Sequence, residues 1–217
     1  MDIEFARYNM IEQQVRPWDV LAPDVLNALR EVPRERFVRG SHATLAFADV
    51  FLPLGHGEVM LAPRIEARLI QALGLSPADR ILEVGTGSGY MTALLAHLGG
   101  DVDSVEIHAD FLEPARARLT DQGLAGKVKL AQGNAAEGWS GGPWDAILLT
   151  GSLPALPLSF RDLLRADGRL VAVVGREPMM EAVRVTRLPT GEFREESLFD
   201  TVIPPLQHSE AKPIFIF

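Results

Sequence analysis

Apolar residues in the second half of the chain form short runs that alternate with helical repeats. Five runs predict strands, at Ile81–Val84, Val102–Ile107, Val128–Ala131, Ala146–Thr150 and Arg169–Val174. Helices are predicted between them, from Met91 to Leu98, from an N-cap at Asp110, and over residues 158–165. Strands that alternate with helices predict parallel pairing with right-handed crossovers, and therefore a doubly wound α/β sheet.

The two ends of the chain follow different patterns. Before residue 75, apolar stripes at helical spacing follow Pro23 and Pro63, and residues 47–58, rich in glycine and proline, predict an irregular loop. Three late segments, residues 182–188, 194–202 and 213–217, predict antiparallel strands at one sheet edge. We expect a helical N-terminal cover (residues 1–75) over the substrate and a sheet domain (residues 76–217), packed as one structural unit.

Composition narrows the class of protein. The 217 residues carry 21 Lys and Arg against 29 Asp and Glu, a net charge of −8, which argues against a nucleic-acid-binding surface. The absence of cysteine excludes disulfides, thiol nucleophiles and thiolate metal sites, and is compatible with a reducing cytoplasm. No apolar run approaches the roughly 20 residues that cross a bilayer. The N-terminal residues do not form a secretory signal, so we expect a cytoplasmic protein without a membrane partner.

Three glycines follow the first predicted strand and open the next helix, at Gly85, Gly87 and Gly89. Such a loop lets the backbone and the helix N-terminus approach a ligand closely. The dinucleotide-binding fingerprint needs a further glycine where Tyr90 stands, which disfavours a dehydrogenase, and the phosphate-binding lysine motif is missing. Glu83 would repel a pyrophosphate but suits a cationic ligand, such as the ammonium or sulfonium of S-adenosylmethionine.

The ends of the next two strands carry side chains suited to a nucleoside. Glu106 ends the second strand, where a carboxylate can accept both ribose hydroxyls of an adenosine. Ile107 beside it can pack against adenine, and Asn134 and Ala135 follow the third strand, where the amide can meet the adenine edge. These residues therefore favour S-adenosylmethionine as the cofactor, with S-adenosylhomocysteine as the product.

Six motifs follow one another along the chain, at Pro33–Val38, Ala46–Asp49, Leu52–Gly57, Glu83–Tyr90, Glu137–Trp139 and Val202–Leu206. In this order they resemble the protein-L-isoaspartate O-methyltransferase family of class I S-adenosylmethionine-dependent methyltransferases. The resemblance implies a Rossmann-like sheet of seven strands and methyl transfer to a carboxylate of damaged protein. It also implies a set of cofactor-binding residues, namely Glu83, Gly85, Thr86, Gly87, Gly89, Tyr90, Glu106, Ile107, Asn134 and Ala135.

The chain departs from the family pattern beside the glycine-rich loop. The family's Thr-Ile-Ser segment is Val59-Met60-Leu61 here, and Leu61 replaces a serine linked to catalysis. Leucine neither donates nor accepts a hydrogen bond, so no catalytic residue is assigned. The family's adenine-proximal aspartate is Asn134. Two alternatives follow: a binding module that retains the cofactor, or an enzyme that methylates a different, more apolar small molecule.

Plainer interpretations stand beside these assignments. The glycines can serve only a tight turn, Glu106 can be a solvated strand end, and Asn134 can be a turn residue. Asp145 is expected to cap or pair structurally, and Met60 and Leu61 to be apolar lining. Trp139 and Trp144 are expected to pack. The histidines show no metal-ligand spacing, so no metal site is predicted; they are His42, His56, His97, His108 and His208, with His56 a weak candidate for the binding pocket.

Overall fold

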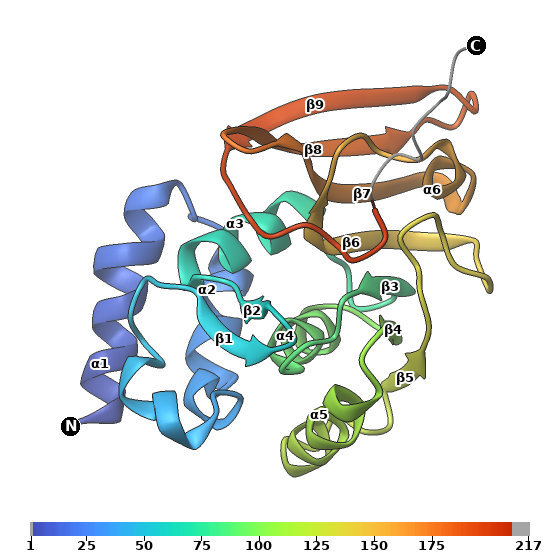
Figure 1. Cartoon of the computed structure of the whole chain (residues 1–217). Coiled ribbons are helices and arrows are strands. Elements are labelled where there is room, and N and C mark those ends of the chain that lie inside the picture. Colours follow the sequence, from blue (N-terminus) through green and yellow to red (C-terminus); the bar gives the residue numbers. More distant parts are fainter. Residues whose placement is uncertain (1, 210–217) are drawn as a thin grey trace.

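Seven strands form one mixed sheet in the computed structural model, which describes residues 2–209 (Figure 1). They are β3 (Ile81–Val84), β4 (Val102–Glu106), β5 (Val128–Gln132), β6 (Trp144–Leu153), β7 (Leu164–Arg176), β8 (Met179–Arg187) and β9 (Phe193–Asp200). The spatial order is β5-β4-β3-β6-β7-β8-β9, parallel as far as β7 and antiparallel beyond it. The predicted sheet is confirmed; the strand predicted at 213–217 lies outside the described residues.

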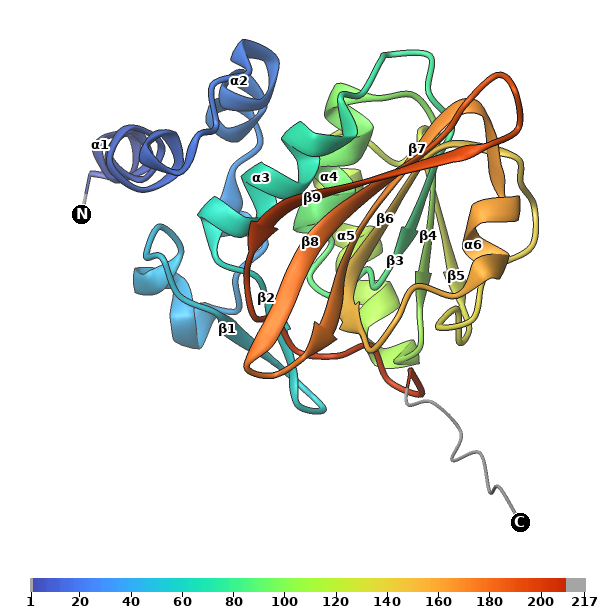
Figure 2. The ribbon, with the colours of Figure 1, turned by 90° about the horizontal axis from the view of Figure 1, so that it is seen from above.

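Helices cover both faces of this sheet. The α-helices are α1 (Ile3–Asn9), α2 (Pro23–Glu31), α3 (Pro63–Leu73), α4 (Tyr90–Leu98), α5 (Ala109–Asp121) and α6 (Leu158–Asp162), with a π-helical turn at Met10–Val15. Of these, α3 to α6 pack against strands, whereas α2 packs against α3 and α4. Figure 2 shows α3 and α4 on one face and α6 on the other. Ile81 and Leu82 belong to different apolar clusters, one on each face, as the two-residue period of a strand requires. No described helix is long and apolar enough to cross a membrane.

Three local predictions were wrong. Residues 47–58 are not wholly irregular, because they contain β1 (Leu52–Gly55) and lead into β2 (Glu58–Met60), which together form a hairpin. Asp110 does not cap α5; His108 holds the N-cap position, and the Asp110 carboxylate pairs with His56 instead. Helix α6 ends before residue 165 because Leu164 is fully buried and already pairs with the sheet.

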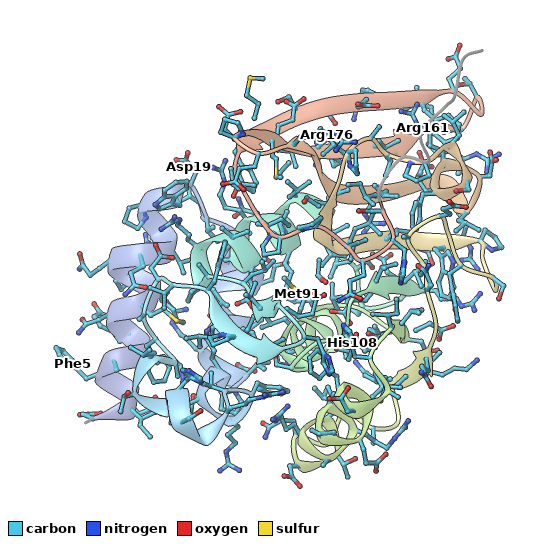
Figure 3. The ribbon with its side chains drawn as sticks, viewed as in Figure 1. Phe5, Asp19, Met91, His108, Arg161 and Arg176 are labelled. Carbon is cyan, nitrogen blue, oxygen red and sulfur yellow. The ribbon has the colours of Figure 1, made fainter. Side chains whose placement is uncertain are left out.

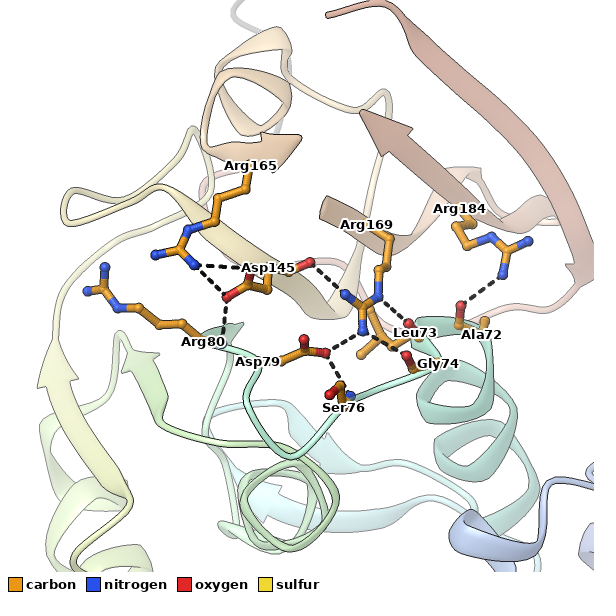
Figure 4. Close-up of polar contacts among 10 residues, drawn as sticks. All are labelled: Ala72, Leu73, Gly74, Ser76, Asp79, Arg80, Asp145, Arg165, Arg169 and Arg184. Carbon is orange, nitrogen blue, oxygen red and sulfur yellow. Dashed lines mark hydrogen bonds and ion pairs between the residues drawn. The ribbon is translucent and has the colours of Figure 1, made fainter. Parts of the chain in front are cut away.

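Arg169 on β7 joins the end of α3 to the sheet (Figure 4). Its guanidinium donates to the carbonyl oxygens of Leu73 at 2.5 Å and Gly74 at 2.7 Å, and it pairs with Asp79. A cation at these carbonyls is favourable because they form the negative end of the helix. Asp145 accepts hydrogen bonds from the Arg80 amide at 2.9 Å and from Arg165, which confirms its predicted structural role.

A buried ion pair holds the segments of the N-terminal cover together and against the start of α4. Arg34 is fully buried and pairs with Glu66 on α3, which is 2% exposed. The same guanidinium donates to the carbonyl oxygens of Ala46 at 2.9 Å and Leu61 at 2.7 Å. It also stacks 4.9 Å from the ring centroid of Tyr90, the first residue of α4. One side chain therefore connects four separate segments.

Replacing Arg34 should destabilise the fold strongly. In Arg34→Ala the Glu66 carboxylate is left buried without its partner, which costs about 3–5 kcal/mol of unfolding free energy. Arg36→Ala is the matched control, because Arg36 belongs to the same short helical turn and is exposed. Urea unfolding near neutral pH measures the free energy of unfolding of both variants. An equally small loss of unfolding free energy in Arg34→Ala and Arg36→Ala would contradict this account.

Candidate functional site

A cavity opens at the carboxyl ends of β3, β4, β5 and β6, where parallel sheets of this kind bind ligands. Its walls are formed by the β1–β2 hairpin, the glycine loop between β3 and α4, the carboxyl ends of β4 and β5, and a segment at residues 204–207. The lining includes Leu54, Glu58, Val59, Met60, Leu61, Gly85, Thr86, Gly87, Met91, Glu106, Ile107, Phe111, Asn134, Ala135, Thr150, Pro204, Leu206 and Gln207.

The loop between β3 and α4 requires glycine for steric reasons. Gly85 has a φ of +98°, and a Cβ atom there would lie 2.2 Å from the Thr150 hydroxyl. That hydroxyl donates to the carbonyl oxygens of Val84 and Gly85, both at 2.9 Å, and so ties the loop to β6. Gly87 has a φ of +51°, and its Cβ would lie 3.0 Å from Leu54 of the hairpin. A larger side chain would displace the loop from the cavity wall.

Glu106 combines a structural role with an open position in the cavity. One carboxylate oxygen accepts the Gly87 amide at 2.8 Å, and the other accepts the His108 amide at 2.9 Å. The residue is only 4% exposed and lines the cavity, so it is not a solvated strand end. A carboxylate oxygen accepts more than one hydrogen bond, so both oxygens retain capacity for a ligand's hydroxyl groups.

Asn134 and its neighbours form the wall beside Glu106. The Asn134 side-chain oxygen accepts the Ala136 amide at 3.0 Å, which is a turn contact, and the residue also lines the cavity. Ile107 and Ala135 add apolar surface there. The turn interpretation and the binding interpretation of Asn134 are therefore compatible. Together these residues provide apolar surface and one amide side chain beside the Glu106 carboxylate.

Glu83 lies behind the glycine loop rather than in the cavity lining. It is fully buried, and its Oε2 accepts the Thr92 and Ser104 hydroxyls, each at 2.5 Å. Burial raises the pKa of Glu83 to about 8, because these hydrogen bonds offset only part of the desolvation and the charge of Glu106 raises it further. These hydrogen bonds hold the Glu83 carboxyl behind the glycine loop, between β4 and α4, where it supports the loop.

Two further predicted cofactor residues also lie outside the cavity lining. Gly89 has a φ of +85°, and its Cβ would lie 3.2 Å from Ala115 on α5, so glycine permits close helix packing there. Tyr90 is 1% exposed and contacts both Arg34 and Phe37. The ring centroids of Tyr90 and Phe37 are 5.5 Å apart. Both residues position the start of α4. Trp144, fully buried, and Trp139, packed on the core, behave as predicted.

The segment at residues 204–207 also lines the cavity, which the sequence pattern did not predict. Pro204 and Leu206 line the cavity because the main chain pairs with Ser152 at the end of β6. Ser152 donates its amide to Pro204 O at 2.9 Å and accepts the Leu206 amide at 2.9 Å. The Val202–Leu206 motif was visible in the sequence, but its place beside the glycine loop depends on this long-range pairing.

Comparisons with known proteins agree with this geometry. Residues 6–211 match the sequence model of a family described as protein-L-isoaspartate(D-aspartate) O-methyltransferase. The chain is 40% identical over 202 residues to protein-L-isoaspartate O-methyltransferase 1 of Rhodopseudomonas palustris, covering 92% of this chain and 82% of that one. The chain is also 35% identical to protein-L-isoaspartate O-methyltransferase of Gloeobacter violaceus, covering 91% of this chain and 96% of that one.

A solved structure shows the same fold. It is that of a Plasmodium falciparum protein described as a protein-L-isoaspartate O-methyltransferase in complex with S-adenosylhomocysteine. The TM-score is 0.78 at 21% identity, with 95% of this chain and 99% of that chain covered. At this level of identity the likeness concerns the architecture of the sheet and its helices.

Glu106→Gln should weaken binding of S-adenosylhomocysteine at least tenfold. A carboxamide retains one acceptor but loses the charge, and each charge-assisted hydrogen bond to a ribose hydroxyl contributes about 1.5–3 kcal/mol. Asp103→Asn is the control, because Asp103 lies on the same strand but faces Arg80, 3.7 Å away. Titration calorimetry measures both affinities; unchanged binding in Glu106→Gln would exclude Glu106 as the ribose acceptor.

The raised pKa of Glu83 predicts a specific pH dependence of stability. The pKa of about 8 in the folded protein lies above the ordinary glutamate pKa of 4.5, so between these two pH values the folded protein binds a proton that the unfolded chain has released. The stabilisation is therefore complete below pH 4.5 and is lost as the pH rises through 8. Urea unfolding at about pH 6 and about pH 9 should show a larger loss for the wild type than for Glu83→Gln. An identical change in both proteins would contradict the assignment.

Proposed function

The chain belongs to the protein-L-isoaspartate(D-aspartate) O-methyltransferase family, and on that premise we propose that it methylates isoaspartyl carboxylates of damaged proteins. The observation that carries the proposal is the family match over residues 6–211, supported by 40% identity across most of a curated isoaspartyl methyltransferase. A cytoplasmic location is part of the proposal, and a chain without cysteine is compatible with it.

The cavity suits S-adenosylmethionine, which supplies an activated methyl group on a sulfonium when bound. The fit depends on the buried Glu106 carboxylate, which lines the cavity and already holds the Gly87 amide. Glu106 would accept the ribose hydroxyls, while Ile107, Asn134 and Ala135 would surround the adenine. The glycine loop allows the main chain to lie against the rest of the cofactor.

Methyl transfer to a carboxylate needs little acid–base chemistry from the protein. A carboxyl group with a pKa near 4 is already ionised at neutral pH, so no general base is required. A bound cofactor would supply the methyl group of its sulfonium to the acceptor carboxylate, so that one positive and one negative charge would cancel. Apolar lining from Met60, Leu61 and Met91 would favour this charge loss by excluding water.

Leu61 defines how this chain positions its methyl acceptor. Its side chain lines the cavity and cannot hydrogen-bond, whereas its carbonyl oxygen is held by Arg34 at 2.7 Å. Catalysis would therefore depend on orientation and desolvation rather than on a hydroxyl at this position. The same apolar surface favours the second candidate, transfer to a more apolar small molecule, which the following experiment distinguishes.

Radiolabelled methyl transfer to an isoaspartyl peptide should give a base-labile methyl ester, with no transfer to the matching aspartyl peptide. Leu61→Ser should raise the turnover about two- to tenfold, the equivalent of one added hydrogen bond of about 0.5–1.5 kcal/mol. Cofactor affinity, measured in parallel, shows whether the binding site is intact. Bound cofactor without transfer to either peptide, in wild type and Leu61→Ser alike, would reject isoaspartyl activity and favour the second candidate.

A further inference from the structure

Two histidines and an aspartate meet at the tip of the β1–β2 hairpin, beside the mouth of the cavity. His56 lies in the hairpin turn, and its Nε2 is 3.0 Å from the nearer carboxylate oxygen of Asp110 on α5. The rings of His56 and His108 stack with centroids 4.2 Å apart and planes 8° apart. One potential ligand atom from each of the three residues lies within 4.8 Å of the other two.

The chain holds these side chains in place from two directions. Gly55 and Gly57 flank His56, which itself has a φ of +54°, so a tight turn presents the ring. His108 is the N-cap residue of α5, and its backbone amide is fixed by Glu106 at 2.9 Å. Figure 3 labels His108 between the hairpin and α5. The two histidines are 52 positions apart in the sequence, which explains why sequence spacing predicted no metal site.

The surroundings supply support typical of metal-binding histidines. The Gln207 amide nitrogen lies 3.0 Å from His108 Nε2 and 2.8 Å from Glu58, and the Glu58 carboxylate is 3.7 Å from the same His108 nitrogen. The Phe111 ring packs edge-on against both imidazoles, at 5.5 and 5.3 Å. Outer partners of this kind orient ligating imidazoles.

We propose that His56, His108 and Asp110 bind a divalent transition-metal ion of the zinc type, which fastens the hairpin to α5. Imidazole nitrogen and carboxylate oxygen are ligands that zinc accepts, with water completing the coordination. Ligand atoms now up to 4.8 Å apart draw together around the ion, and the hairpin moves with His56. The ion takes the place of the His56–Asp110 hydrogen bond and binds His108 through Nδ1, so that Gln207 remains the outer partner of His108 Nε2.

The proposed site differs from the histidine–carboxylate pair that joins α2 and α4. His97 lies 3.3 Å from Glu31, an ordinary pair across two helices. Within residues 2–209, no third ligand-type residue joins that pair in a potential metal-binding group. His97→Ala is therefore a matched control, since it removes a histidine beside a carboxylate without touching the proposed site.

Zinc titration of the untagged protein, freed of metal and held in a non-coordinating buffer, tests the proposal. We expect one saturable equivalent of Zn²⁺ per chain, unchanged in His97→Ala. His56→Ala and Asp110→Asn should each bind at least about tenfold more weakly, since even an outer partner of a metal ligand contributes roughly 10–100-fold. Both substituted side chains are well exposed, at 47% and 63%, so the fold should tolerate the changes; thermal melting checks this.

Hydrogen exchange of the hairpin gives a second readout. Zinc should slow exchange of amides in residues 52–60 in the wild type and in His97→Ala, but not in His56→Ala. Absence of saturable binding, equal affinity in His56→Ala and wild type, or loss of binding in His97→Ala would each overturn the proposal. A bound equivalent that leaves hairpin exchange unchanged would overturn the fastening of the hairpin to α5.

Discussion

The guanidinium of Arg34 has no access to water, so its charge and its donors must be satisfied inside the protein. It meets this requirement with Glu66, with the carbonyl oxygens of Ala46 and Leu61, and with the face of Tyr90. Removing any partner would leave a buried polar group unpaired. The segments at Ala46 and Leu61, helix α3 and the start of α4 are therefore held in one arrangement. The cavity lies against this arrangement, because Leu61, Glu66 and Met91 line it.

The cavity divides its tasks between two walls. On the sheet side, Glu106 holds the glycine loop through the Gly87 amide, and the residue lines the cavity. On the cover side, Leu54, Val59, Met60 and Leu61 line the cavity together with Glu58. One wall is suited to recognise a nucleoside and the other to exclude water from a reaction in which opposite charges cancel. This division fits a methyl transfer that depends on positioning.

The regular parts of the molecule could be predicted closely from sequence. Strand β3 and helix α3 follow from local apolar patterns, and the glycine loop follows from the only residue type that fits its backbone. Contacts between distant segments could not be predicted. Asp110 is a good local cap, yet His56 takes its carboxylate, and Glu83 faces α4 because its strand position turns it away from the cavity.

The most direct test is a crystal structure with S-adenosylhomocysteine and an isoaspartyl peptide bound together. The account predicts both ribose hydroxyls within hydrogen-bonding distance of the Glu106 carboxylate. It also predicts that the peptide's free carboxylate lies between the cofactor sulfur and the Leu61 side chain. A nucleoside that does not contact Glu106, or a peptide carboxylate held away from Leu61, would contradict it.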